Sequence, residues 1–236
     1  MSNINGNRNP TRRIQEKYYR DLYNKKKGTT MIVSSESWAH KNVRFEKITN
    51  LMKDDDKFSV HDVGMGIADM YQYMRNRFPN KSFIYSGTEI LGEYYEEAKN
   101  RFPECNFFLR DIAESAFEEH YDYLIMSGIF HQRRESSIRD WEKFAQQIIS
   151  NSFKMCNKGI AFNFISPFVD FYQTEVYYAN MPKILNFIND DLSRFFTVYH
   201  DYPLFEFTVH VYKEEYIKLR YQQSELQKYF HDEVIL

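Results

Sequence analysis

The stretch His61-Asp62-Val63-Gly64-Met65-Gly66-Ile67-Ala68-Asp69, residues 61–69, decides the expected fold. Apolar residues at positions 58, 60 and 63 precede the two glycines, and apolar residues spaced three and four apart follow over 67–78. This pattern predicts a strand, a tight turn and a helix. Glycines at such a turn let the backbone approach a ligand closely.

The charges around this turn indicate which ligand it can accept. A dinucleotide-binding turn would have a third glycine at position 69, where this chain has Asp69. Asp62 and Asp69 flank the turn, so a pyrophosphate would be repelled and an ammonium group attracted. S-adenosylmethionine carries an ammonium, a sulfonium and an adenosine but no phosphate, and it therefore fits the turn better than a dinucleotide.

Alternating strands and helices extend outward from this turn. Strands are predicted at 58–63, 82–89, 106–109, 121–126 and 160–165, and helices at 67–78, 91–102 and 135–155. Such alternation predicts a doubly wound α/β fold with a mostly parallel sheet and helices on both faces. A helix at 181–192 is followed by strands at 195–200 and 204–213, whose three-residue link permits only an antiparallel hairpin. The sheet should therefore have seven strands, and residues 214–236 are predicted to form a charged terminal helix.

The first part of the chain differs in charge from the rest. Residues 1–30 have eight basic and two acidic side chains, a net charge of +6, whereas the whole chain of 236 residues has −2. Residues 1–57 are predicted to form a basic arm and a helical cap, with helices near 11–23 and 38–52. Residues 58–236 form the main domain. The arm is either a solvated, frayed leader or a segment that folds over a phosphorylated or nucleotide-bearing ligand.

Composition limits the class of protein. Apolar residues make up 43% of the chain, with 21 Phe and 19 Tyr, which is enough to build a buried core. The two cysteines, Cys105 and Cys156, form neither a disulfide framework nor a Cys-x-x-Cys pair. The sequence shows no signal peptide or apolar run long enough for a membrane span. We therefore expect a cytoplasmic protein without membrane contact.

Four segments resemble the motifs of class I S-adenosylmethionine-dependent methyltransferases of the small-molecule type. Residues 61–69 resemble the glycine-rich motif, with Ala68 where many members have a third glycine. Glu89 matches the acidic residue that ends strand two and holds the ribose hydroxyls. Residues 110–112 resemble the motif near the adenine amino group, and residues 127–131 the segment beneath the methionine moiety. The resemblance covers residues 58–165, and the terminal antiparallel strand extends it.

The resemblance implies S-adenosyl-L-methionine as the cofactor. The implied cofactor-binding residues are Asp62, Gly64, Met65, Gly66, Glu89, Ile90, Asp111, Ile112 and Ser127. No metal is implied, because Ser127-Gly128-Ile129-Phe130-His131 lacks the acidic ligands of magnesium-dependent members. The same segment lacks the Pro-Pro-aromatic motif of amino-methylating nucleic-acid enzymes, and no cysteine stands where a pyrimidine C5 enzyme needs its nucleophile.

The acceptor is expected to be a small molecule, such as a sugar or a nucleotide-linked biosynthetic intermediate, methylated on oxygen or nitrogen. The predicted acceptor region combines residues 38–44, an insert at about 166–180 and residues 200–202. The substrate-binding candidates are Trp38, Arg44, Phe168, Tyr172 and Tyr178. Aromatic faces suit sugar or nucleobase stacking, although packing on the sheet edge or in a homodimer would also use them.

A hydroxyl acceptor would need a general base. His131, which follows strand four, is the first candidate, and His200 with Asp201 at the end of strand six is the second. Two alternatives remain open. One is an RNA methyltransferase that uses the basic arm on phosphates, and the other is a non-catalytic methyltransferase-like subunit.

Overall fold

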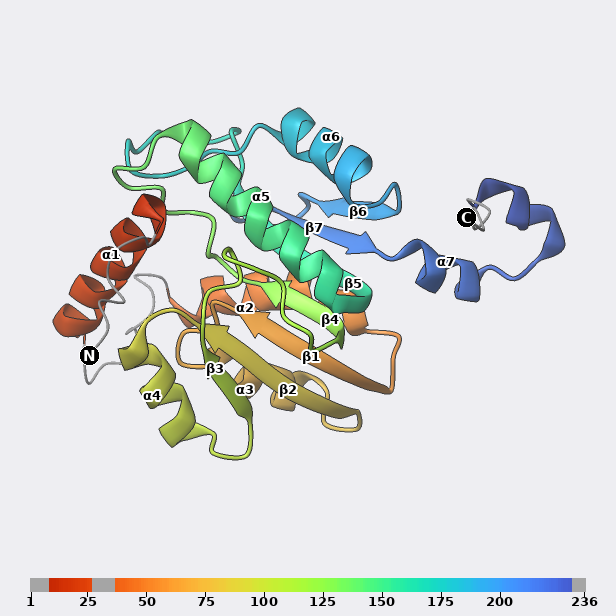
Figure 1. Cartoon of the computed structure of the whole chain (residues 1–236), viewed down its shortest axis with the longest axis horizontal. Helices are drawn as coiled ribbons and strands as arrows, with labels where there is room; N and C mark the ends of the chain where they lie inside the picture. Colours follow the sequence, from red (N-terminus) through yellow and green to blue (C-terminus); the bar gives the residue numbers. More distant parts are fainter. Residues whose placement is uncertain (1–8, 27–36, 231–236) are drawn as a thin grey trace.

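Seven strands form one sheet at the centre of the protein, in a computed structural model that describes residues 9–26 and 37–230 (Figure 1). The strands are β1 (Lys57–Val63), β2 (Ser82–Glu89), β3 (Asn106–Leu109), β4 (Tyr121–Met126), β5 (Cys156–Ile165), β6 (Phe196–Tyr199) and β7 (Glu206–Tyr212). Their order is β3-β2-β1-β4-β5-β7-β6. β7 runs antiparallel to both β5 and β6, and the other pairs are parallel. The predicted doubly wound fold with a terminal antiparallel hairpin is confirmed.

Helices cover both faces of the sheet. They are α1 (Pro10–Lys26), α2 (Trp38–Thr49), α3 (Asp69–Arg77), α4 (Gly92–Arg101), α5 (Ile138–Met155), α6 (Met181–Asp191) and α7 (Glu214–Arg220), with 3-10 turns at Asn50–Met52 and Ser224–Tyr229. Trp141 of α5 and Ile188 of α6 pack in a core on one face. Ile48 of α2, Met74 of α3 and Ala98 of α4 pack in a second core on the other. β1 and β4 lie between the two cores, and β4 is accordingly apolar over its last four residues, 123–126.

The turn after β1 holds three residues in the left-handed region. Gly64, Gly66 and Ala68 have φ angles of 70°, 56° and 61°. This backbone delays the start of α3 to Asp69, two residues later than the sequence predicts. Ala68 is strained, because its Cβ disfavours positive φ, and it occupies the position where the resembled motif often has glycine.

Ala68→Gly is therefore expected to stabilise the protein by about 1 kcal/mol. The free energy of unfolding in urea measures the effect. Ala98→Gly, in the interior of α4, is the matched control and should destabilise, because glycine there gains no relief of strain and loses helix propensity and packing. If Ala68→Gly and Ala98→Gly destabilise the protein equally, the conclusion that Ala68 is strained is wrong.

α1 lies across the carboxyl ends of the parallel strands, beyond the arrowheads of β1 and β2 on the left of Figure 1. The rings of Tyr19 and Tyr23 pack edge-on against Tyr94 of α4, with centroids 6.4 and 5.6 Å away. Gln15 Nε2 donates a hydrogen bond of 2.7 Å to the carbonyl of Gln132, in the loop after β4. The described part of the basic arm is thus a helix that bridges α4 and this loop, and not a frayed leader.

The last segment departs from the prediction. Residues 214–236 were expected to form one helix, but α7 ends at Arg220 and a 3-10 turn follows over Ser224–Tyr229. Neither piece contains a buried residue, so no packed face extends the helix. No helix within residues 9–26 and 37–230 is long and apolar enough to cross a membrane.

Candidate active site

A cavity of about 210 Å³ opens at the carboxyl ends of β1, β2 and β4, where a parallel sheet places its ligands. All nine predicted cofactor-binding residues line it: Asp62, Gly64, Met65, Gly66, Glu89, Ile90, Asp111, Ile112 and Ser127. α1 contributes Gln15, Tyr18, Tyr19 and Leu22, and α2 contributes Lys41, Arg44 and Phe45. The two N-terminal helices therefore complete a site whose floor comes from the sheet.

Glu89 ends β2 with its carboxylate turned toward the turn after β1. Oε2 accepts a hydrogen bond of 3.0 Å from the Gly66 amide, and Oε1 accepts from the amides of Ile90 and Leu91 at 2.7 and 2.9 Å. Burial raises the Glu89 pKa, and the three amide donors oppose that rise. The carboxylate is fixed by backbone amides, and Oε2, which accepts only one of the three hydrogen bonds, keeps a lone pair for a ligand hydroxyl.

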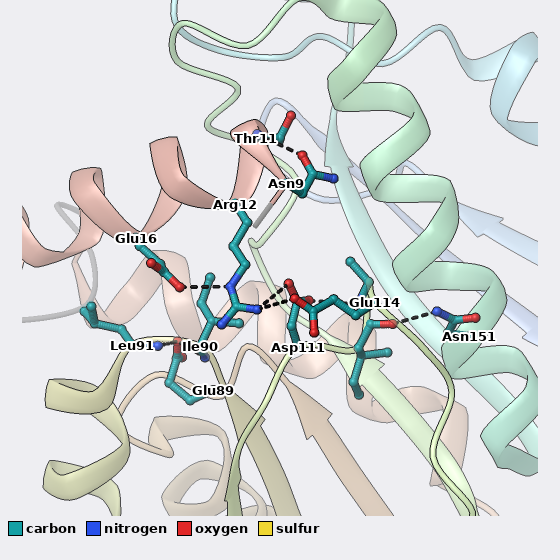
Figure 2. A network of polar contacts seen from close by, with 12 residues as sticks. Asn9, Thr11, Arg12, Glu16, Glu89, Ile90, Leu91, Asp111, Glu114 and Asn151 are labelled. Atoms are coloured by element: carbon teal, nitrogen blue, oxygen red, sulfur yellow. Dashed lines mark hydrogen bonds and ion pairs between the residues drawn. The ribbon is translucent and has the colours of Figure 1, made fainter. Parts of the chain in front are cut away.

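Asp111 follows β3 and lies under the arm helix. Its Oδ1 accepts from the Ala113 amide at 2.8 Å, and its Oδ2 lies 3.3 Å from Arg12 Nη1. Figure 2 shows the Arg12 side chain descending from α1 between Glu16, Asp111 and Glu114, close to Glu89. Burial raises the Asp111 pKa, while the Ala113 amide and the Arg12 charge lower it. One buried arginine thus ties α1 to the predicted adenine end of the site.

The charges at the glycine turn differ from the sequence-based argument. Asp69 is paired with Lys41 Nζ at 2.7 Å and with Arg101 Nη1 at 2.9 Å. Asp62 accepts a hydrogen bond of 2.5 Å from the Tyr85 hydroxyl, and burial raises its pKa to about 7 against that bond. The turn therefore does not present two uncompensated carboxylates, and the predicted repulsion of a pyrophosphate is weaker than the sequence suggested.

Several polar atoms of the cavity lining have no hydrogen-bond partner among the described residues. They are Gln15 Oε1, Arg110 Nε and Nη2, and Ser127 Oγ, all buried. A buried polar group without a partner costs about 1–3 kcal/mol. An adenosine, which offers an amino donor, ring-nitrogen acceptors and two ribose hydroxyls, would supply such partners. The residues present therefore fit S-adenosylmethionine.

His131 lies at the other end of the cavity, in a buried polar cluster. Its Nε2 is 3.1 Å from Asn163 Nδ2 and 3.9 Å from Glu206 Oε2. Glu206 is held by both Arg44 and Asn163. Burial alone would raise the Glu206 pKa, but the charges of His131 and Arg44 and the hydrogen bonds outweigh it and lower the pKa to about 2.

Arg44 and His131 meet at Gly128, which has a φ of 74°. A Cβ at this position would lie 3.3 Å from Arg44 Nη1 and 3.9 Å from His131 Cε1. Arg44 lines the cavity, and its contact with the acceptor stays a prediction. Glycine at position 128 allows the guanidinium and the imidazole to come together at the end of β4.

The second predicted base is not part of this cavity. His200 is exposed and packs on the Phe168 ring at a centroid distance of 5.9 Å. Asp201 is exposed and pairs with Lys47 at 2.9 Å, which lowers its pKa. The carboxyl end of β6 points to the same edge of the sheet, as predicted, but β5 and β7 separate it from β4.

Four of the five predicted substrate contacts also lie outside the cavity lining. Trp38 is half-exposed and stacks against the Lys41 ammonium. Phe168 and Tyr172 are largely exposed, and Tyr172 packs on Tyr178 at 4.7 Å. The insert at 166–180 thus places Phe168, Phe171 and Tyr172 on the surface, whereas its Tyr177 packs in the core, and none of these rings lines the described cavity.

Sequence reasoning missed Asn163 and Glu206 of the His131 cluster and Gln15, Tyr18 and Tyr19 of α1. Asn163 interrupts an apolar run over residues 160–165 of β5, and a buried polar residue of this kind requires a partner. That interruption could have indicated Asn163, whereas Glu206 begins a strand that contains further polar residues and carries no such signal. The α1 residues carry no such signal, because the helix is polar along most of its length.

The comparisons with known proteins agree with this geometry. No protein-family model matches the sequence. A curated protein of Mycobacterium tuberculosis (strain ATCC 25618 / H37Rv), "Putative methyltransferase Rv1506c", is 26% identical over 160 residues, which are 67% of this chain and 95% of that protein.

Two solved structures share the fold. Magnesium protoporphyrin IX methyltransferase from Synechocystis PCC 6803 with bound S-adenosylmethionine matches with a TM-score of 0.59 and 14% identity, over 90% of this chain and 100% of that one. The N-methyltransferase NodS from Bradyrhizobium japonicum WM9 in complex with S-adenosyl-L-homocysteine matches with a TM-score of 0.59 and 10% identity, over 83% and 97% of the two chains.

The strand order, the glycine turn and the cavity define a class I methyltransferase, and the curated relative agrees with that assignment. The chain is thus an enzyme of the class that residues 61–69 resemble. The cofactor of this class is S-adenosylmethionine, as predicted.

Glu89→Ala is expected to weaken S-adenosylmethionine binding by about 1.5–3 kcal/mol, the range for a hydrogen bond to a charged group. Titration calorimetry on the folded variant measures the change in affinity. Glu96→Ala, on the exposed side of α4, is the matched control and should bind as the wild type does. Unchanged affinity in Glu89→Ala would mean that the ribose is held elsewhere.

Proposed function

We propose that this methyltransferase transfers the methyl group of S-adenosylmethionine to an oxygen or nitrogen of a small biosynthetic intermediate, such as a sugar or a nucleotide-linked compound. The cavity at the carboxyl ends of the parallel strands, lined by all nine predicted cofactor-binding residues and covered by α1, carries this proposal. A roof that spans from α4 to the loop after β4 suits a ligand small enough to be enclosed.

In this proposal, different parts of the cavity lining bind the cofactor and align the acceptor. Glu89 and Asp111 hold the ribose and the adenine amino group, while the turn at Gly64 and Gly66 brings the backbone close to the cofactor. When bound, S-adenosylmethionine supplies a methyl group on a sulfonium, which is displaced in line by the acceptor. The protein supplies alignment and exclusion of water, through α1 and α2.

His131 is the proposed general base for a hydroxyl acceptor. It is buried at the end of β4 and lines the cavity, whereas His200 does not. The acceptor proton passes to an unprotonated ring nitrogen of His131, so that the oxygen lone pair can attack the methyl carbon. Arg44, beside His131 at Gly128, is proposed to orient the acceptor.

Titration calorimetry tests the central part of this proposal. The purified protein should bind both S-adenosylmethionine and S-adenosylhomocysteine without added metal, with one site per chain. Folded protein that binds neither would contradict the proposal and favour a non-catalytic methyltransferase-like subunit. An acceptor screen with labelled S-adenosylmethionine then identifies the substrate.

The basic arm gives little support to an RNA substrate. Arg12, Lys17 and Arg20 are paired with Glu16, Asp21 and Glu93 respectively, so much of the charge on α1 is compensated within the protein. An RNA enzyme should lose affinity for its substrate steeply with salt, because phosphate contacts release counterions. For a small-molecule substrate, we expect the turnover of this enzyme to change little with salt concentration.

Deletion of residues 1–30 tests α1 as part of a cap formed by the region before residue 58. The sheet should stay folded, because both large cores lie on the body of the protein. Turnover is expected to fall at least tenfold, since the cavity loses its roof and four lining residues. Deletion of residues 1–8 alone, which keeps α1, is the control. Full activity after the longer deletion would assign the arm no role in catalysis.

A further inference from the structure

Gln15 of α1 is a buried polar residue whose amide has a fixed orientation. It is only 3% exposed, and it lines the cavity. Its Nε2 donates a hydrogen bond of 2.7 Å to the Gln132 carbonyl, which can only accept. The nitrogen of the amide is therefore the end that faces Gln132, and Oε1 is the other end.

The Oε1 atom of Gln15 is an acceptor that lacks a donor. It is buried, and no group within residues 9–26 and 37–230 donates a hydrogen bond to it. Turning the amide over does not solve this, because Oε1 would then face the carbonyl oxygen of Gln132. A buried acceptor without a donor costs free energy. A donor on a ligand in the cavity would remove that cost.

The position of Gln15 on α1 indicates which part of a ligand it meets. Residues 12, 15 and 19 share one face of the helix, because residues three and four apart lie on the same side. Arg12 Nη1 lies 3.3 Å from Asp111 Oδ2 (Figure 2). Burial raises the Tyr19 pKa, and the nearby charge of Glu89 adds to the rise. Gln15 thus stands between the two carboxylates that the proposed function assigns to the adenosine.

The donors of an adenosine are two ribose hydroxyls and one amino group with two hydrogens. Glu89 is the acceptor proposed for the hydroxyls. Asp111 Oδ2 can accept one hydrogen of the amino group, because a carboxylate oxygen has two lone pairs and Arg12 uses only one of them. The second hydrogen of the amino group needs another acceptor. Gln15 Oε1 is a buried acceptor on the same helix face as Arg12.

We propose that Gln15 Oε1 accepts the second hydrogen of the adenine amino group, so that α1 takes part in recognising the base. Arg12 is a positioning residue in this scheme, because it holds α1 over Asp111. The inference rests on the proposed function, which places S-adenosylmethionine in this cavity. It also implies that docking of α1 and binding of adenine favour each other.

The contacts of Arg12 explain how it positions α1. Its guanidinium donates hydrogen bonds of 2.8 Å to Glu16 within α1 and to Glu114 in the segment after β3. The helix that carries Gln15 is thereby linked to the segment that carries Asp111. Burial raises the Asp111 pKa, and the Arg12 charge opposes that rise. An ionised Asp111 can accept a hydrogen from the amino group.

Calorimetry with two ligands tests the role of Gln15. The ligands are S-adenosylhomocysteine and its deamino analogue, in which hydrogen replaces the adenine amino group. The wild type should bind the analogue about tenfold more weakly or worse, since two buried acceptors lose their donor. In Gln15→Met, which keeps the length of the side chain, this ratio of affinities should shrink by about three- to tenfold.

A conservative variant separates recognition of adenine from support of α1. Gln15→Glu keeps an acceptor oxygen in either protonation state and should discriminate between the two ligands as the wild type does. Lys17→Met, whose native side chain is 81% exposed, is the control and should leave both affinities unchanged. If Gln15→Met weakens both ligands equally, Gln15 supports α1 or contacts another part of the cofactor, and the proposal is wrong. An equal decrease of the ratio in Gln15→Glu and Gln15→Met also contradicts it.

The same ratio tests the positioning role of Arg12. Arg12→Met should lower the ratio, because α1 then no longer holds Gln15 over the base. In the double variant Arg12→Met/Gln15→Met the ratio should decrease by less than the product of the two single effects, since both changes act on one contact. Equal weakening of both ligands by Arg12→Met would reduce Arg12 to a structural residue.

Amide hydrogen exchange tests the link between α1 and the base. With each ligand at saturation, S-adenosylhomocysteine should slow exchange in residues 14–26 of the wild type more than the deamino analogue does. Equal slowing by both ligands would contradict the link.

These measurements separate the inference from the function on which it rests. Folded wild-type protein that does not bind S-adenosylhomocysteine would overturn the proposed function. Binding of S-adenosylhomocysteine with an unchanged ratio in Gln15→Met would overturn only the role of Gln15.

Discussion

His131→Ala is expected to lower the rate of methyl transfer to a hydroxyl acceptor by roughly 100-fold or more, with S-adenosylmethionine affinity nearly intact. The reason is that His131 lines the part of the cavity proposed to hold the acceptor, whereas the fixed carboxylates Glu89 and Asp111 are proposed to hold the cofactor. Single-turnover kinetics with labelled cofactor measure the transfer step, and calorimetry measures the affinity.

The pH dependence of the wild type provides the second readout for the same residue. A protonated imidazole cannot accept the acceptor proton, so the rate should fall as the pH drops through the range in which histidines titrate, around 6.5. This decrease of the rate at low pH, the acid limb of the pH profile, should be absent in His131→Ala. His200→Ala is the matched control, because His200 is exposed and outside the cavity.

Each other outcome has a definite meaning. If His200→Ala removes the acid limb, the base lies at the end of β6 and the assignment to His131 is wrong. If neither variant changes the pH profile, histidine is not the base. An amine acceptor that is already deprotonated in solution would then be the better explanation.

Gly66→Val is expected to abolish measurable cofactor binding and to destabilise the fold by about 1–3 kcal/mol. Gly66 has a φ of 56°, a conformation that a β-branched residue adopts only under strain, and its amide donates to Glu89 Oε2. The added side chain would also compete with the cofactor for the cavity that Gly66 lines.

Calorimetry and urea unfolding separate the two effects of Gly66→Val. Gly92→Ala, at the start of α4, is the matched control. It has ordinary helical backbone, and the nearest atom to its new Cβ is Leu109 Cδ2 at 4.0 Å. Alanine should be neutral or stabilising at this position. Wild-type affinity in a folded Gly66→Val protein would contradict the proposed cofactor site.

Much of the fold could be predicted from local sequence. The predicted bounds of β2, β3 and β4 agree with the structure, because Pro79 and Pro103 follow the helices that precede β2 and β3, and β4 ends in an apolar run over residues 123–126. The start of α5 was placed three residues early, since Ser137 caps the helix by accepting a hydrogen bond from the Asp140 amide. The apolar periodicity predicted an earlier start, but the capping hydrogen bond of Ser137 sets the first residue of α5.

The cofactor end of the site was predictable for the same local reason. Gly64, Gly66 and Glu89 belong to strand ends and turns, and strand ends at one edge of a parallel sheet meet in space whatever covers them. The aromatic insert was not predictable in this way. Its side chains suggested an acceptor site, but Phe168 and Tyr172 lie on the surface, because aromatic composition does not specify direction.

The sequence by itself therefore determined the strand–turn–helix at residues 61–69, the alternation of strands and helices that makes the sheet mostly parallel, and the residues that line the floor of the cavity. The tertiary structure alone decided what closes the cavity and what surrounds His131. Gln15 meets Gln132 across 117 positions, and Arg44 meets Glu206 across 162. Such contacts depend on how whole helices and strands pack against one another, and neither periodicity nor turn chemistry encodes that packing.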